Sequence, residues 1–182
     1  MNIILQKNEK NFIFYHIIHL FVEHNYQPMT KFIICAFFIA LNLKAQTNLP
    51  DVTLSNLEGK KISLTKDFSE QDKLYVLSFW ATWCTPCVEE MPLLEAFFQE
   101  NQSKSWQVVG LAIDQPSAVK RFLKQNPVNY PIGFAGLGGT ELVKTLGNPE
   151  GGLPFTLVLN AQGGLIVQKL GKLSSQEMRE WV

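Results

Sequence analysis

The chain has 182 residues, of which 46% are hydrophobic, and its 16 basic residues balance 16 acidic ones. This hydrophobic content is typical of a packed globular protein and argues against a disordered chain. Residues 46–182 contain 12 basic and 14 acidic residues without any basic run, which argues against a nucleic-acid-binding surface. The same region has no histidine, and its cysteines are Cys84 and Cys87 alone.

The N-terminal part of the chain has the pattern of an export signal at residues 29–45. Lys31 gives a positive start, residues 32–41 form an apolar run of 10, and Leu43-Lys44-Ala45 offers a small-residue cleavage site. Because a membrane span needs about 20 residues, this run is too short to cross a bilayer. We predict a signal peptide, with an uncleaved membrane anchor or a buried helix as the alternatives.

Residues 1–28 are apolar and aromatic, but three histidines interrupt them. They would make the positive region of a signal far too long, so we predict that translation starts at Met29. A membrane-associated extension is the alternative. In both cases residues 46–182 form one domain that faces an oxidising compartment, where a cysteine pair can cycle or stay oxidised.

This domain shows strand and helix patterns along its whole length. In chain order they are a hairpin at 52–64, a buried strand at 73–81, a helix at 85–101, a second buried strand at 106–114, a helix at 116–125, an extended stretch at 130–134, a helix at 139–146, strands at 154–160 and 165–171, and a helix at 174–182. Strands that alternate with helices, followed by a hairpin and a helix, predict an α/β fold. Its mixed sheet should be covered by helices on both faces.

Cys84 and Cys87 lie in the stretch FWATWCTPCVEEMP, where they could bind a metal, staple the fold or exchange electrons. A structural zinc site needs four ligands, and no histidine after residue 45 can complete one. A site shared between two chains, or a copper(I) site, stays open as an alternative. A purely structural disulfide is a weak explanation, because closing so short a loop adds little stability.

Electron exchange fits the local pattern best. Cys84 ends a buried strand and Pro86 favours a helix start, so we expect Cys84 at the N-cap of the helix. Unpaired backbone N–H groups and the helix dipole stabilise a thiolate there, and the thiolate is the species that attacks a disulfide. Cys87, one turn further on, is expected to lie deeper and to release the substrate from the mixed disulfide.

The same stretch resembles the active site of the thioredoxin superfamily, specifically that of exported TlpA/ResA-like thiol–disulfide oxidoreductases. The resemblance covers the domain to its C-terminus and implies a thioredoxin-like fold, with a central mixed sheet, flanking helices and an N-terminal β-hairpin. It also implies that Glu90 exchanges protons with Cys87, although a solvated helix glutamate is the alternative. Most thioredoxins carry a buried acid on the preceding strand, where this chain has Ser78.

Pro154 resembles the cis-proline of that superfamily, which lies in a loop beside the cysteines. The resemblance implies that the Leu153–Pro154 bond is cis and that the backbone of Leu153 pairs with an extended client segment. An ordinary trans turn proline is the alternative. The family usually has a small hydroxyl residue after this proline, whereas Phe155 stands here and leaves the substrate preference open. Trp83 is expected to contribute exposed apolar surface beside Cys84, or simply to pack.

We therefore predict an exported protein-disulfide oxidoreductase that needs no cofactor and no metal. It should act as a reductase, because the histidine that strongly oxidising relatives carry between the cysteines is missing. The resemblance implies a location in or facing the periplasm, disulfide-bonded exported clients, a membrane electron donor and roles such as cytochrome c maturation. A thioredoxin-fold peroxidase and a metal or haem chaperone are the alternatives. The sequence lacks the proline that a peroxidase has before its reactive cysteine. Residues 46–182 also lack histidines that a metal or haem chaperone could use.

Overall fold

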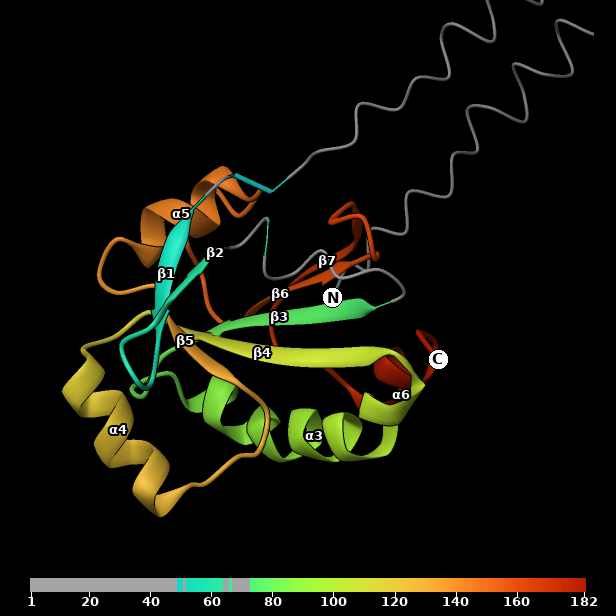
Figure 1. The fold of residues 1–182 in the computed structure, drawn as a ribbon, viewed down its shortest axis with the longest axis horizontal. Helices are drawn as coiled ribbons and strands as arrows, with labels where there is room; N and C mark the ends of the chain where they lie inside the picture. The colour runs from blue at the N-terminus through green and yellow to red at the C-terminus, as the bar shows by residue number, and fades with distance from the viewer. Residues whose placement is uncertain (1–48, 51, 64–65, 67–72) are drawn as a thin grey trace, which may run out of the picture. The chain divides into compact units, whose positions relative to one another are not determined.

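A computed structural model describes residues 49–50, 52–63, 66 and 73–182 of the chain (Figure 1). The predicted upstream extension and signal peptide lie outside these residues and stay predictions. Within the described ranges, no helix has both the length and the apolar character needed to cross a membrane.

The described chain forms one sheet of seven strands in the order β2-β1-β5-β4-β3-β6-β7. The strands are β1 (Thr53–Asn56), β2 (Lys61–Ser63), β3 (Leu74–Trp80), β4 (Trp106–Ala112), β5 (Ile132–Phe134), β6 (Phe155–Leu159) and β7 (Leu165–Leu170). β3, β4 and β5 pair parallel, whereas β1, β2, β6 and β7 join the sheet through antiparallel pairings. The mixed sheet predicted from the sequence is confirmed.

The two strands with continuous apolar runs lie at the centre of this sheet. Every residue of β3 after Leu74 is buried, and so is every residue of β4 except Gln107. Apolar side chains on both faces of a strand need cover on both sides, which a central position supplies. The positions of β3 and β4 therefore follow from their composition.

Helices cover both faces of the sheet, as predicted. They are α3 (Thr85–Asn101), α4 (Pro116–Gln125), α5 (Gly139–Thr145) and α6 (Ser175–Arg179), with the short 3-10 helix η1 (Gln102–Lys104) directly after α3. Figure 1 shows α3, α4 and α6 on one side of the sheet and α5 on the other. α3 continues through Pro92.

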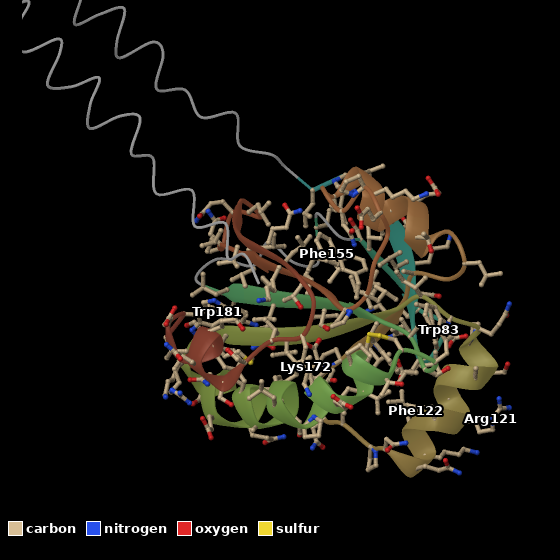
Figure 2. All side chains as sticks on the ribbon, turned by 180° about the vertical axis from the view of Figure 1, so that it is seen from behind. Trp83, Arg121, Phe122, Phe155, Lys172 and Trp181 are labelled. Carbon is tan, nitrogen blue, oxygen red and sulfur yellow. A yellow bond between two sulfur atoms is a disulfide. The ribbon has the colours of Figure 1, made fainter. Side chains whose placement is uncertain are left out.

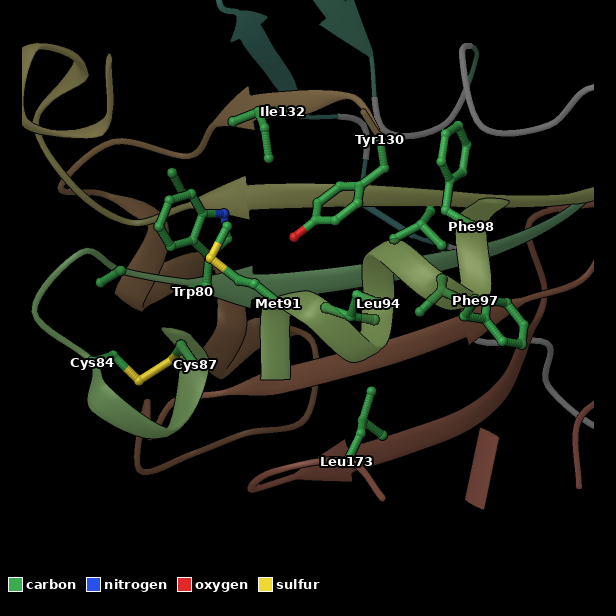
Figure 3. Packing of buried hydrophobic residues seen from close by; sticks show 14 of the residues in the cluster. Trp80, Cys84, Cys87, Met91, Leu94, Phe97, Phe98, Tyr130, Ile132 and Leu173 are labelled. Atoms are coloured by element: carbon green, nitrogen blue, oxygen red, sulfur yellow. A yellow bond between two sulfur atoms is a disulfide. The ribbon is translucent and has the colours of Figure 1, made fainter. Parts of the chain in front are cut away.

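The hydrophobic core divides into two clusters, one on each face of the sheet. The α3-side cluster includes Trp80, Met91, Leu94 and Phe97, and the α5-side cluster includes Leu77, Phe79, Leu142 and Phe155. Side chains of β3 alternate between the two clusters because successive residues of a strand point to opposite faces. Cys84 and Cys87 belong to the α3-side cluster (Figure 3), so the cysteine pair is part of the core.

Candidate active site

Cys84 occupies the N-cap of α3, at the end of the loop that follows β3. Its backbone is extended (φ −89°, ψ 96°), while Thr85 and Pro86 begin the helix. The Cys84 carbonyl accepts the first helical hydrogen bond from the Val88 N–H (3.1 Å), and no side chain caps the helix. The first N–H groups of α3 are therefore available to an anion at the Cys84 sulfur, which favours the thiolate once the bridge is reduced.

Cys84 and Cys87 form a disulfide with a Cα–Cα distance of 5.3 Å. Cys84 is 5% exposed, whereas Cys87 is 0% exposed and lies one helical turn deeper. Figure 3 shows the bridge at the first turn of α3, with Trp80 and Met91 nearby. A client sulfur approaching from solvent meets Cys84 before Cys87, so the two cysteines are unequal in access.

Glu90 is buried in the α3-side core, at 1% exposure, one turn after Cys87. Its Oε2 accepts a hydrogen bond from the Leu173 N–H (2.9 Å) and its Oε1 one from the Ser78 hydroxyl (3.4 Å). Burial raises the pKa of Glu90 to about 7, and these hydrogen bonds and the Lys172 charge only partly oppose the increase. Glu90 is thus not a solvated helix glutamate, and it can gain or lose a proton near neutral pH.

The Ser78 position on β3 and the Glu90 position on α3 meet in space. Ser78 is fully enclosed on the α3 face, directly opposite Thr156 of β6. Most thioredoxins have a buried acid at the Ser78 position of this strand. In this chain the Glu90 carboxylate reaches the same region from α3. Thr156 is also fully buried, and within the described chain its hydroxyl has no hydrogen-bond partner. Sequence analysis missed Thr156, because a continuously apolar run does not show which residues share a face.

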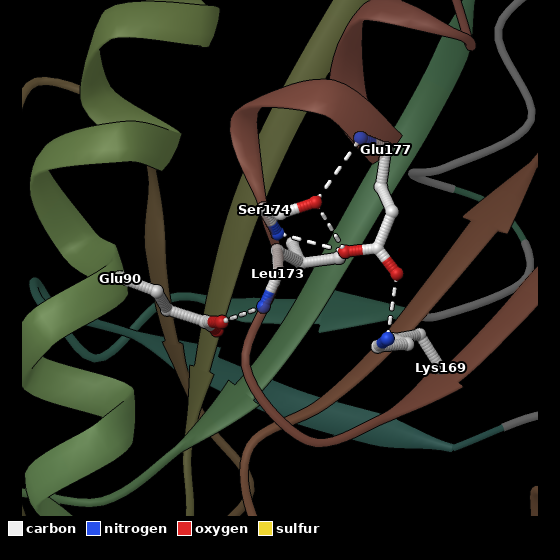
Figure 4. A network of polar contacts seen from close by, with 5 residues as sticks. All are labelled: Glu90, Lys169, Leu173, Ser174 and Glu177. Carbon is white, nitrogen blue, oxygen red and sulfur yellow. Dashed lines mark hydrogen bonds and ion pairs between the residues drawn. The ribbon is translucent and has the colours of Figure 1, made fainter. Parts of the chain in front are cut away.

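The loop between β7 and α6 supplies the main partner of Glu90 (Figure 4). α6 begins with a capping box, in which the Ser174 hydroxyl accepts from the Glu177 N–H and the Glu177 carboxylate accepts from the Ser174 N–H. Lys169 of β7 also binds Glu177 (2.6 Å). The sequence predicted a helix at 174–182, but it contained no local signal that the neighbouring Leu173 would bind Glu90.

Pro154 is buried at the start of β6, and the Leu153–Pro154 peptide bond is cis. The trans alternative is therefore excluded in this structure. The Pro154 carbonyl accepts a hydrogen bond from the Gly171 N–H (2.8 Å), which ties this loop to the end of β7. Leu153 is half-buried and contacts both core clusters.

Phe155 does not lie on the cysteine side of the sheet. Its side chain is fully buried in the α5-side cluster, with its ring centroid 5.9 Å from that of Phe79. The Phe155 side chain therefore faces away from the cysteine pair. The strand alternation after Pro154 turns Thr156, rather than Phe155, toward Glu90.

Trp83 and Trp80 have different environments although they are three residues apart. Trp83 is 70% exposed immediately before Cys84 (Figure 2), whereas Trp80 is buried against Phe122 of α4. The loop that carries Trp83 is anchored by Asp114, whose carboxylate accepts hydrogen bonds from the Thr82 N–H and hydroxyl. Burial opposes ionisation of Asp114, but these bonds and one from Gln115 lower its pKa. No local pattern in the sequence indicated that Asp114 would hold this loop.

Metal ligands do not gather anywhere in the described chain. No group of three or more His, Cys, Asp or Glu residues among the residues described is arranged to hold a metal ion. The site thus consists of a cysteine pair, a buried acid, an exposed tryptophan and a cis-proline loop.

A Cys-x-x-Cys disulfide at the start of a helix, packed on a thioredoxin-like mixed sheet, defines the class of thiol–disulfide oxidoreductases. The chain belongs to the AhpC/TSA family, whose pattern matches residues 45–169.

Similar proteins of known class narrow the class of this chain further. Thiol-disulfide oxidoreductase ResA of Bacillus thuringiensis subsp. konkukian is 33% identical over 134 residues, which cover 73% of each chain. The crystal structure of StoA from Bacillus subtilis has a TM-score of 0.59 at 26% identity, covering 73% of this chain and 96% of that one. A thioredoxin-related protein from Neisseria meningitidis serogroup B has a TM-score of 0.60 at 31% identity, covering 70% and 93%. The predicted ResA-like oxidoreductase class and thioredoxin-like fold are confirmed.

Proposed function

We propose that this protein is an exported reductase of protein disulfides, in which Cys84 attacks and Cys87 resolves. The observation that carries the proposal is the unequal burial of the two cysteines at the N-terminus of α3. Cys84, the more accessible of the two residues, lies where a thiolate is stabilised, and the fully buried Cys87 lies one turn further into the helix.

The reaction consumes the reduced form of the pair. The Cys84 thiolate attacks one sulfur of a client disulfide, forms a mixed disulfide and releases the other client sulfur as a thiolate. The Cys87 thiolate then attacks the Cys84 sulfur, which forms the internal bridge and releases the second client thiolate. Two electrons pass from the pair to the client, and a dithiol donor at the membrane returns them.

Glu90 acts as the proton acceptor for Cys87 in this scheme. A buried thiol must lose its proton before it can attack, and a neighbouring carboxylate can take that proton only if its pKa is close to the working pH. Burial brings the pKa of Glu90 into that range. Glu90 lies one turn after Cys87 on the same helix, so the two side chains share one side of α3.

The client segment binds beside the disulfide. Trp83 offers an exposed apolar ring next to Cys84, and the loop at Leu153 and Pro154 provides the backbone groups that pair with an extended peptide. Export rests on the signal pattern at residues 29–45, and it places the domain in or facing the periplasm. A retained N-terminal segment would anchor it to the membrane.

Trapping of the mixed disulfide tests this function. The Cys87→Ala variant cannot resolve, so it should stay covalently bound to clients through Cys84 when it is expressed in exported form. Cys84→Ala is the matched control and should trap far less material. A dominant set of clients, released by dithiothreitol and identified by mass spectrometry, supports the proposal. Equal trapping by the two variants would refute the assigned roles.

A further inference from the structure

Three consecutive residues after β7 contact the cis-proline loop and two adjacent glutamates of α3. The Gly171 N–H donates to the Pro154 carbonyl (2.8 Å). The Lys172 ammonium pairs with the Glu89 carboxylate (2.7 Å), and the Leu173 N–H donates to the Glu90 carboxylate (2.9 Å). The adjacent glutamates of α3 thus bind adjacent residues of one segment, which we name the 171–173 segment.

The 171–173 segment is held in place from both ends. Gly171 adopts φ +93°, a conformation that favours glycine, directly after the last residue of β7. At the other end, Leu173 is buried in the α3-side core and Ser174 caps α6. The segment therefore presents the Leu173 N–H to Glu90 from a fixed position.

Charged and polar groups reach Glu90 from every element around it. They are Lys172 in the segment, Glu177 of α6, Ser78 of β3, and Tyr130 just before β5. Lys172 favours the ionised carboxylate and Glu177 opposes it. Burial, followed by the charges of Glu95 and Glu90, holds the pKa of Tyr130 above its ordinary value, so the phenol stays neutral in the physiological range. Among the described residues Lys172 is thus the cation that acts on Glu90, and Glu89 binds it on the α3 surface.

We propose that the 171–173 segment is a positioning element for Glu90, in which the Leu173 N–H orients the carboxylate and the Glu89–Lys172 ion pair keeps the segment against α3. This inference rests on the proposed role of Glu90 as the proton acceptor for Cys87. Because Gly171 binds the carbonyl of Pro154 and Leu173 binds Glu90, the 171–173 segment holds both the client-binding loop and the proton-accepting acid. In this proposal Lys172 and Glu89 are positioning residues that act through Glu90.

A double-mutant cycle on the ion pair tests the proposal. The variants are Lys172→Met, Glu89→Gln and both together in the full domain. Lys144→Met and Glu141→Gln form the matched control, because that exposed pair has the same 2.7 Å separation on α5. Two measurements are made on each variant: the carbon-13 titration of the Glu90 carboxylate, and the pH profile of kcat/KM for disulfide reduction.

Lys172→Met should raise the midpoint of the Glu90 titration by about half a pH unit, since the lysine is half-exposed and its charge is partly screened. The pH profile should move in the same direction. The shift should be smaller in the Glu89→Gln background, where the lysine is no longer held. The control variants should move neither the midpoint nor the profile.

No shift beyond that of the control variants, or strictly additive shifts, would overturn the positioning role. If the Glu90 titration shifts but the pH profile of kcat/KM does not, Glu90 takes no part in the exchange reaction. The positioning role proposed for the 171–173 segment would then also be wrong. That outcome stays distinguishable from failure of the whole proposed function, because trapping by Cys87→Ala depends on Cys84 and not on Glu90.

Discussion

At the scale of single residues, the site depends on where three side chains lie along one helix. Cys84, Cys87 and Glu90 follow one another at intervals of three residues, so they share one side of α3 at increasing distance from its N-terminus. Cys84 is 5% exposed, whereas Cys87 and Glu90 are almost fully buried, at 0% and 1%. The side chain that meets the client is therefore the most accessible, and the one that handles the proton is enclosed.

The enclosed carboxylate should make the stability of the oxidised protein depend on pH. In the unfolded chain Glu90 ionises near pH 4.5, whereas in the folded chain burial raises its pKa to about 7. Between these values the folded state binds more protons than the unfolded state, so the free energy of unfolding falls as pH rises. Above pH 7 the burial of ionised Glu90 lowers the free energy of unfolding by its full amount, about 3 kcal/mol.

Glu90→Gln should remove this dependence, because the amide keeps its shape without ionising. We expect the variant and the parent to have similar free energies of unfolding at pH 4.5, and the variant to be more stable by about 3 kcal/mol at pH 8. Denaturant unfolding at several pH values measures the difference. Glu100→Gln, an exposed change on the same helix, is the control. A pH-independent difference for Glu90→Gln would contradict the assigned pKa.

At the scale of elements, the short helix α6 matters more than its five residues suggest. Its capping box fixes Ser174, and the residue before it supplies the N–H that binds Glu90. Lys169 ties the same cap to β7. A helix this short has little stability of its own, so its position depends on the cap and on the packing of Met178 in the core.

Ser174→Ala should destabilise the protein by about 1 kcal/mol through loss of the cap. Ser175→Ala is the matched control, because Ser175 is an exposed first-turn residue outside the capping box. Thermal and denaturant unfolding give the free energies, and amide hydrogen exchange at Leu173 should be faster in Ser174→Ala only. If both variants lose the same stability, the cap does not hold this end of the chain.

At the scale of the whole molecule, the question is the direction in which electrons flow. A strongly oxidising disulfide needs a strongly stabilised reduced form. Here the helix N-terminus stabilises a Cys84 thiolate, but no histidine exists after residue 45 to add to it. The buried Glu90 below the bridge also makes a second negative charge at Cys87 unfavourable.

We therefore expect a reducing potential, between about −200 and −300 mV, in the range of thioredoxin-like reductants. Equilibration of the domain with glutathione or dithiothreitol buffers measures it, with tryptophan fluorescence reporting the state of the pair. A potential near −120 mV, at the strongly oxidising end, would reverse the proposed direction. Under that result the protein would form disulfides in its clients.

The element order and the redox pair were predictable from local patterns alone. The buried strands β3 and β4 follow from continuous apolar runs, and the N-cap position of Cys84 follows from the strand end and Pro86. These features depend on residues within one turn or one strand of each other. The burial of Glu90 also had a local signal, since it lies on the same helical stripe as Cys87 and Leu94.

Only the tertiary structure decided how the acid is held and which face each loop residue takes. Lys172 and Leu173 bind Glu89 and Glu90 across 83 residues of sequence, and Asp114 binds Thr82 across 32. No periodicity encodes such contacts, because they arise when separate elements pack on one sheet. By itself the sequence determined which chemistry the chain carries, whereas packing determined the pKa of Glu90, because desolvation exists only once the core has closed.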